Sequence, residues 1–226
     1  MLGADGLAID VGCGDGRYAV EIARRFGCSV LGVDPVMRQV ERARALVDGS
    51  GLSGLVRIEQ ASIQALPAKQ ASVDCVWCRD MLVHVDARAG LAECARVLRS
   101  GGHMLVYHVF ATEAMGEAEA GRIYRGLGIV PANMKESYFF SAAETAGLSV
   151  ARKEVVGSSW REWRAEGGST ELQHDIVSLA RLRRREAELV ARYGRHFYEA
   201  AYALRHWGVY VMLGKLQPTM YDLTRG

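Results

Sequence analysis

Asp10 and three closely spaced glycines are the residues of this chain whose types and spacing most plainly suggest chemistry. Asp10 lies in the apolar run 7–11, and Gly12, Gly14 and Gly16 follow that run directly. Alternate glycines allow a tight turn in which the backbone approaches a ligand closely. Apolar residues at helical spacing over 17–26 predict a helix, and free N–H groups at its start favour a polar or anionic group. The segment therefore predicts a strand, a glycine loop and a helix that together form a ligand site.

A second carboxylate, Asp34, ends the next predicted strand, 28–33, and Pro35 follows it. One interpretation makes Asp34 the N-cap of the following helix, with Pro35 in the first turn. The other makes the carboxylate an acceptor for both hydroxyls of a ribose. The glycine loop upstream favours the ribose, so we expect a ligand that contains a nucleoside.

The glycine spacing narrows the kind of nucleoside. In the nicotinamide fingerprint G-x-G-x-x-G the third glycine would fall on Arg17, whereas this chain has Gly16. The run 10–16, Asp-Val-Gly-Cys-Gly-Asp-Gly, instead resembles the first motif of class I S-adenosylmethionine-dependent methyltransferases, in particular the ubiquinone-methyltransferase-like superfamily of small-molecule enzymes. The resemblance implies S-adenosyl-L-methionine as cofactor and S-adenosyl-L-homocysteine as product. It implies that the methionine end is held by Asp10, Val11, Gly12, Cys13, Gly14 and Gly16, and the ribose by Asp34 and Pro35.

The resemblance extends through 6–110. Segment 56–67 is similar to the family's third strand and adenine-side loop, with Ser62 where many members have Asp, so Ser62 and Ile63 are expected at the adenine. Segments 73–78 and 103–110 are similar to the fourth and fifth strands, with a helix over 91–98 between them. Arg79, just past the fourth strand, is expected beside the cofactor. The alternative for Arg79 is an ion pair with Asp80 or a helix-end partner.

The alternation of strands and helices predicts the fold class α/β, with a doubly wound, Rossmann-like parallel sheet. The family implies seven strands with an antiparallel last strand, here 148–156 and 219–224 as strands six and seven, Pro218 leading into an edge. The chain is then one domain, 1–226, with a cofactor-binding half at 6–110 and a substrate half at 111–226. Helical segments are expected at 36–47, 112–126, 135–146, 170–180 and 184–213. A helical insert over about 157–217 is expected to form a lid over the acceptor pocket.

The acceptor side offers several candidates. His108, expected at the end of the fifth strand and beside the substrate pocket, and His84 are candidate general bases. Each has a structural alternative, a hydrogen bond to a nearby carbonyl for His108 and packing for His84. Aromatic side chains that could line the pocket or stabilise a cation are Tyr18, Trp160, Trp163 and Trp207. An aromatic stripe at helical spacing can equally be core, and both interpretations stay open for the long helix.

Composition limits the classes of partner. The 226 residues carry a net charge of +2, which makes no global case for nucleic acid. The run Arg181-Leu182-Arg183-Arg184-Arg185 precedes two glutamates and is interpreted as a solvated helix surface. There is no apolar run of membrane-spanning length and no signal peptide, so a cytoplasmic protein is expected. Five scattered cysteines fit reduced thiols, and Cys75 and Cys78, three apart on a strand, do not form a metal site.

These observations favour methyl transfer from S-adenosylmethionine to an O, N or C atom of a small-molecule acceptor by in-line displacement. An RNA or protein methyltransferase and a non-catalytic cofactor-binding subunit stay open as alternatives. A nicotinamide oxidoreductase is disfavoured by the glycine spacing. The sequence leaves open whether two chains pair as a homodimer.

Overall fold

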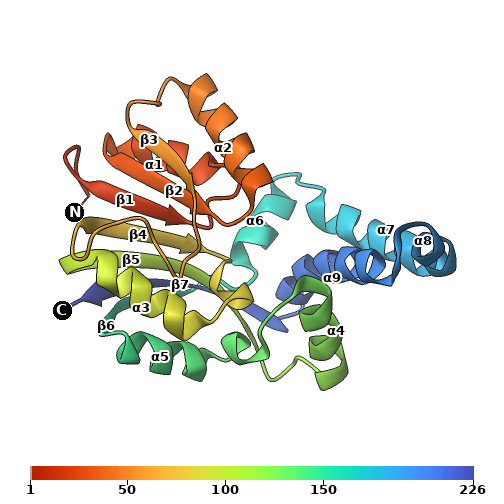
Figure 1. The fold of residues 1–226 in the computed structure, drawn as a ribbon. Helices are drawn as coiled ribbons and strands as arrows, with labels where there is room; N and C mark the ends of the chain where they lie inside the picture. The colour runs from red at the N-terminus through yellow and green to blue at the C-terminus, as the bar shows by residue number, and fades with distance from the viewer. Residues whose placement is uncertain (1) are drawn as a thin grey trace.

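The computed structural model describes residues 2–226, which form helices packed on both faces of one sheet (Figure 1). The seven strands of these residues lie in the order β3-β2-β1-β4-β5-β7-β6. β7 alone is antiparallel to its neighbours, β5 and β6. The strands are β1 (Leu7–Val11), β2 (Ser29–Asp34), β3 (Val56–Gln60), β4 (Val73–Arg79), β5 (Leu98–Ala111), β6 (Leu148–Val155) and β7 (Leu216–Arg225). The predicted doubly wound sheet with an antiparallel last strand is confirmed.

Apolar runs create the central strands because a parallel sheet is buried on both faces. Ile9 of β1 pairs with Leu31 of β2 on one side and with Val76 of β4 on the other, and all three are buried. The chain goes outward from β1 to β3 and then returns to β4 on the far side of β1. The carboxyl ends of β1 and β4 therefore border the crevice where such sheets bind ligands.

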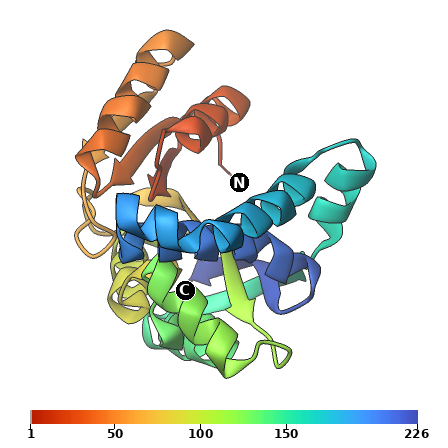
Figure 2. The ribbon, with the colours of Figure 1, turned by 90° about the vertical axis from the view of Figure 1, so that its right-hand side faces the viewer.

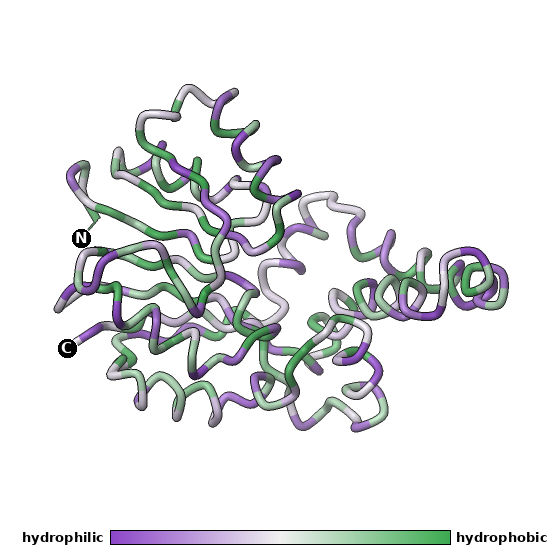
Figure 3. Tube along the Cα trace, in the orientation of Figure 1, coloured by the Kyte–Doolittle hydropathy of each residue, from purple (hydrophilic) through white to green (hydrophobic). Residues whose placement is uncertain are grey.

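Helices cover the two faces with separate cores. α1 and α2 bury residues such as Ala23 and Val40 on one face, while α3 and α5 bury Leu91 and Phe139 on the other. These helices are α1 (Arg17–Phe26), α2 (Met37–Ser50), α3 (Ala87–Val97), α4 (Glu117–Leu127) and α5 (Glu136–Thr145), with short 3-10 turns η1 (Leu82–His84) and η2 (Pro131–Met134). Figure 3 shows apolar residues concentrated along the strands that these helices enclose.

The segment between β6 and β7 consists of four helices, α6 (Ser159–Glu166), α7 (Glu171–Arg184), α8 (Glu186–Tyr193) and α9 (Arg195–Met212). Figures 1 and 2 show α7 to α9 projecting from the strand ends, with α7 crossing in front of α9. α9 packs against α4 and α7, and its buried residues include Ala203 and Tyr210. α6, α7 and α8 contain no buried residue, so this part of the insert is held by few apolar contacts.

Several predicted boundaries were wrong. The continuous helix predicted over 184–213 is broken at Gly194, whose φ of 86° and ψ of 156° end α8 before α9 begins. Pro218 lies inside β7, which is an interior strand of the sheet and not an edge. The helices predicted from 91 and 112 begin at Ala87 and Glu117, because Asp86 caps the first and residues 112–115 form a turn. No helix within residues 2–226 is both long enough and apolar enough to cross a membrane.

Candidate active site

A cavity of about 300 Å³ opens at the carboxyl ends of β1 and β4. It is the place where the sheet topology predicts a ligand. Its lining residues come from the glycine loop, the start of α1 and the end of β4, and they are Asp10, Gly12, Cys13, Gly14, Asp15, Arg17, Tyr18, Trp77, Arg79 and Asp80. The structure thus brings together Asp10, the loop glycines, Tyr18 and Arg79 from the predicted set.

Asp10 is the buried carboxylate of this cavity. Only 2% of the residue is exposed, and its Oδ2 atom has no hydrogen-bond partner among the described residues. Burial raises the pKa of Asp10 to about 7, and the nearby Asp34 and Asp15 add to the rise, while the Ala19 amide opposes it. A buried carboxylate oxygen without a partner is costly in a folded protein, so this atom is suited to accept a hydrogen bond from a bound cation.

The glycine loop is shaped by its backbone conformation. Gly12, Gly14 and Gly16 have φ of 71°, 54° and 81°, values that favour glycine. A Cβ on Gly12 would come within 3.1 Å of Met81, whereas the space beside Gly14 is open. Together with Asp10, the loop forms a backbone cradle on the floor of the cavity.

The amides of the loop are less free than predicted. The N–H groups of Gly12 and Cys13 both donate to the carbonyl of Val33, at 2.8 and 2.9 Å. The Gly16 amide donates to the Cys13 carbonyl, and the Arg17 amide donates to Asp15. The prediction that free amides at the start of the helix attract an anion is therefore wrong for these groups, and cationic or hydroxyl groups fit this end better.

Asp34 holds the loop against the second strand. Its Oδ2 accepts the Gly14 amide at 3.0 Å and its Oδ1 accepts the Val36 amide at 2.9 Å. The N-cap interpretation is wrong, because α2 begins after Val36. Each carboxylate oxygen retains a second lone pair, so Asp34 can still accept ribose hydroxyls. Neither Asp34 nor Pro35 lines the 300 Å³ cavity, and the Pro35 carbonyl accepts a hydrogen bond from Gln60.

The adenine-side candidates also lie outside this cavity. Ser62 is engaged in a turn, where its hydroxyl donates to the Gln64 side chain and accepts the Gln64 amide at 3.1 Å. The Ile63 side chain is buried in the core against Gly90, and Val11 is buried in the same core. Only the backbone groups of Ile63 and Val11 can therefore contact a ligand.

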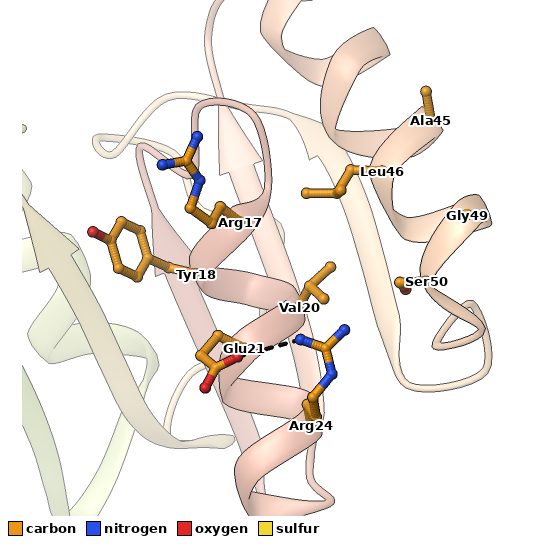
Figure 4. Close-up of a pocket in the computed structure, with 9 residues that line it drawn as sticks. All are labelled: Arg17, Tyr18, Val20, Glu21, Arg24, Ala45, Leu46, Gly49 and Ser50. Carbon is orange, nitrogen blue, oxygen red and sulfur yellow. Dashed lines mark hydrogen bonds and ion pairs between the residues drawn. The ribbon is translucent and has the colours of Figure 1, made fainter.

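Arg79 combines both interpretations made from the sequence. Its guanidinium donates to the Tyr18 hydroxyl and lies 4.9 Å from the Tyr18 ring centroid. It also forms the ion pair with Asp80, with 3.5 Å between Nε and Oδ2. Tyr18 reaches the site from α1, and Figure 4 shows its ring pointing away from a hollow of about 600 Å³ between α1 and α2. The rings of Tyr18 and Trp77, whose centroids lie 6.1 Å apart, line the cavity.

The two histidines occupy structural positions. His108 is 1% exposed, lies within β5 and not at its end, and its Nε2 is 2.8 Å from the Asn133 carbonyl oxygen. Burial lowers its pKa to about 4, so it is neutral near pH 7. The placement of His108 at a strand end was wrong, and this geometry favours the structural interpretation. His84 is exposed at the end of η1, with its Nδ1 3.4 Å from the Gly128 carbonyl oxygen.

The tryptophans separate into different environments. Trp160, at the start of α6, has a buried Nε1, and its side chain faces the Tyr107 phenol. Trp163 is 73% exposed, and Trp207 packs partly buried against the core between α4 and α9. Trp160 is therefore the insert tryptophan that the structure brings toward the strand ends.

Sequence reasoning missed three residues near the end of β4, namely Asp80, which follows that strand, Tyr107 of β5 and Arg161 of α6. The Asp80 amide donates to the Tyr107 carbonyl at 3.1 Å, and the charges of Asp80 and Arg161 both influence the Tyr107 phenol. Asp80 has a φ of 55°, which is rare for a residue other than glycine. Aspartate adopts this left-handed conformation more often than most residues, but its type alone does not indicate where it does so. Arg161 comes from α6, 81 residues further along the chain.

Two other hollows flank the site. The one between α1 and α2 contains the surface ion pair of Glu21 and Arg24, 3.3 Å apart (Figure 4). A larger one, of about 760 Å³, covers Cys75, Trp77 and Leu105 on the sheet face beside α1. No group of three or more histidine, cysteine, aspartate or glutamate side chains in residues 2–226 is arranged to hold a metal ion.

The residues of the 300 Å³ cavity fit the methionine end of S-adenosylmethionine. The unpartnered Oδ2 of Asp10 suits an ammonium group, and the guanidinium of Arg79 suits a carboxylate. The rings of Tyr18 and Trp77 offer faces to a sulfonium. The cavity thus offers opposite charges and aromatic faces to a ligand that is zwitterionic and also carries a cationic sulfur.

Comparisons with known proteins agree with this fit. Residues 9–106 match the family model of a methyltransferase domain. The 27-O-demethylrifamycin SV methyltransferase of Amycolatopsis mediterranei is 32% identical over 157 residues, which are 68% of this chain and 57% of that protein. The matches with the first curated relatives span only 36–38% of those proteins' lengths.

Solved structures share the fold over nearly the whole chain. Geranyl diphosphate C-methyltransferase from Streptomyces coelicolor, solved with S-adenosyl-L-homocysteine, superposes with a TM-score of 0.72 at 18% identity, covering 99% of this chain and 74% of that one. The [4+2]-cyclase SpnF superposes with a TM-score of 0.76 at 23% identity, covering 99% and 76%. Likeness at these identities shows the fold alone, because one fold supports different chemistries.

Proposed function

From the premise that this chain is related to the class I S-adenosylmethionine-dependent methyltransferases, we propose that it transfers a methyl group from S-adenosylmethionine to an O, N or C atom of a small molecule. One observation carries the proposal. The cavity at the ends of β1 and β4 places the unpartnered Asp10 beside the glycine loop, Arg79 and two aromatic rings. The methyltransferase family model matches the same part of the chain.

Bound S-adenosylmethionine would supply an electrophilic methyl group on a sulfonium. Asp10 then accepts hydrogen bonds from the ammonium group, and Arg79 faces the carboxylate. Asp34 accepts the ribose hydroxyls, while Ser62 and the backbone of Ile63 face the adenine. The chain's main contribution is to align the acceptor and exclude water, which in favourable cases supplies on the order of 7–11 kcal/mol of the barrier.

Calorimetric titration tests the cofactor. We expect S-adenosylmethionine and S-adenosylhomocysteine to bind with micromolar affinity and a reduced nicotinamide dinucleotide not to bind. Asp34→Ala should weaken binding of both adenosyl compounds at least tenfold, because the carboxylate is lost from the ribose and from the Gly14 amide. Asp48→Ala, an exposed position on α2, is the matched control and should bind like the wild type. Unchanged affinity in Asp34→Ala, or dinucleotide binding, would refute the assignment.

The alternatives predict different outcomes. An RNA methyltransferase would bind RNA with an affinity that falls steeply with salt. Its candidate contact, the arginine run 181–185, is partly neutralised, since Arg185 pairs with Glu188 at 2.8 Å. A non-catalytic subunit would bind cofactor and never release S-adenosylhomocysteine from S-adenosylmethionine with any acceptor.

The cellular compartment and the self-association of the protein are also part of the proposal. Five free cysteines support a reducing compartment, for which we propose the cytoplasm. Self-association through α8 and α9 stays a prediction, with the exposed Tyr193, Phe197 and Leu204 as its contacts.

A further inference from the structure

Buried polar atoms without partners gather where α6 meets the strand ends. Among the described residues, eight buried side-chain nitrogen or oxygen atoms lack a hydrogen-bond partner. Two of them, Asp80 Oδ1 and Arg161 Nε, belong to residues whose charges act on the Tyr107 phenol, and the Trp160 side chain faces the same phenol. Native proteins pair nearly all such atoms, and Asp80 lines the 300 Å³ cavity, so the unpartnered atoms beside it point to a missing ligand.

Asp80 presents its carboxylate to the cofactor cavity. Its backbone is held at a φ of 55° by the hydrogen bond from its amide to Tyr107, and such strain concentrates at functional sites. Oδ2 lies 3.5 Å from Arg79 Nε, while Oδ1 has no partner. Asp80 lines the same cavity as Asp10, so its carboxylate lies near the proposed position of the methyl donor.

Arg161 brings a second positive charge to this place, and it forms no close ion pair within the described part of the chain. No carboxylate among the described residues lies within 4.0 Å of its guanidinium. Asp175, which approaches the same face of Gly208, pairs instead with Arg205 at 3.1 Å. The guanidinium lies 4.8 Å from the centroid of the Trp160 ring. A buried guanidinium nitrogen without a partner is suited to bind an anion.

The charges around the cluster select the acceptor. The charges of Arg79 and Arg161 are both positive, and both act on the Asp80 carboxylate. This balance disfavours an ammonium and favours a neutral nucleophile that is attached to an anionic group. A hydroxyl needs an acceptor for its proton, and Asp80 is a carboxylate that faces the cavity.

We propose that Asp80, Trp160 and Arg161 form the acceptor subsite, and that the acceptor is a small molecule with a hydroxyl and an anionic group. Arg161 holds the anion, and Asp80 faces the hydroxyl. This inference rests on the proposed methyl transfer. The acceptor oxygen forms a bond to the methyl carbon, the carbon–sulfur bond breaks with its electron pair passing to sulfur, and the hydroxyl proton passes to the Asp80 carboxylate.

The test measures binding to the complex with S-adenosylhomocysteine by calorimetry. The probes are benzoate and its 2-, 3- and 4-hydroxy derivatives. We expect wild type to bind benzoate and Arg161→Gln to bind it at least tenfold more weakly. Arg152→Gln removes an equal charge at an exposed site on β6 and should bind like wild type. Absence of benzoate binding in wild type, or equal binding in Arg161→Gln, would overturn the anion site.

A second comparison tests Asp80. At least one hydroxybenzoate should bind wild type more tightly than benzoate, and Asp80→Asn should shrink this advantage several-fold. Asp80→Asn should also bind benzoate two- to fivefold more tightly, because it removes a like charge. If neither change occurs, Asp80 does not face the acceptor. Each variant's affinity for S-adenosylhomocysteine is measured first, so that failure of the cofactor assignment is seen separately from failure of the acceptor subsite.

Discussion

Three aspartates at the strand ends of this protein differ in how the backbone satisfies them. Asp34 accepts two backbone amides, so its carboxylate is fixed before any ligand arrives. Asp10 keeps one buried oxygen without a partner, and Asp80 keeps another on a strained backbone. The fixed carboxylate of Asp34 orders the glycine loop, whereas the unpartnered oxygens of Asp10 and Asp80 remain available to a ligand.

The raised pKa of Asp10 predicts a pH dependence of cofactor affinity. Asp10 must be ionised to attract the ammonium group, and burial with the neighbouring Asp34 and Asp15 raises its pKa to about 7. Below that pH the free protein carries a proton that must leave on binding, so affinity rises with pH. One such proton predicts that the Kd for S-adenosylmethionine falls about tenfold between pH 6 and pH 8. Calorimetry across this range measures it.

Asp10→Asn is the control for this dependence. The Cys13 and Cys78 thiols near Asp10 have pKa values raised to about 12, so they stay neutral across the range. The variant should therefore bind more weakly with a flat profile between pH 6 and pH 8. The same tenfold change in Asp10→Asn would assign the titration to another group.

The sequence predicted those site residues whose type is closely tied to their structural role. The glycines needed positive φ, and Asp10 and Asp34 follow from their places in apolar strands. Asp80 was not predicted as a site residue, because its position depends on the hydrogen bond from its amide to Tyr107 on the neighbouring strand. His108 was predicted at a strand end beside the pocket. β5 instead continues to Ala111, and His108 is buried against Phe110 and Phe139.

At the scale of elements, the contact between α4 and α9 fixes the insert to the sheet domain. Gly126 of α4 lies so close to α9 that a Cβ there would come within 2.7 Å of the Ala203 Cβ and of the Glu199 carbonyl oxygen. The opposing atoms are backbone and a short side chain, which cannot move away cheaply. Glycine at this position is therefore explained by close helix packing and not by its backbone angles.

Gly126→Ala should lower the free energy of unfolding by about 1–3 kcal/mol, because the added methyl group overpacks the helix interface. Gly121→Ala is a matched control on the same helix, where the added Cβ meets only the flexible end of Arg125. It should stabilise the protein by roughly 0.5–1 kcal/mol through helix propensity. Urea unfolding measures both. Equal effects of the two substitutions would contradict the close contact between α4 and α9.

Element types were easier to predict than the breaks between them. Periodicity indicated one helix over 184–213, since apolar spacing continues across Gly194. Gly194 was the local signal for the break, but the periodicity outweighed it, and in the structure Arg195 pairs with Glu186 at 2.6 Å across the turn. Pro218 indicated an edge strand, yet the sequence carries no local sign that 148–155 pairs outside β7.

At the scale of the whole molecule, the sheet domain and the insert differ in how firmly they are held. Each face of the sheet has its own hydrophobic core, whereas α6, α7 and α8 bury no residue. Segments with few buried apolar contacts open at low free energy, and the lids of active sites are drawn from such segments. The proposed lid is thus anchored by α9 and is weakly held at α6, where the acceptor subsite forms.

Hydrogen exchange should show whether α6 closes over the site when ligands bind. In the free protein the amides of α6 should exchange quickly, because the helix makes few buried contacts. S-adenosylhomocysteine together with benzoate should slow exchange in α6 at least fivefold, since Arg161 would then gain the partner that its Nε lacks. α8, which is equally unburied and contains none of the proposed ligand contacts, serves as the internal control and should not change. Equal slowing of α6 and α8 would indicate general stabilisation of the insert, and unchanged exchange in α6 would contradict its role as a lid.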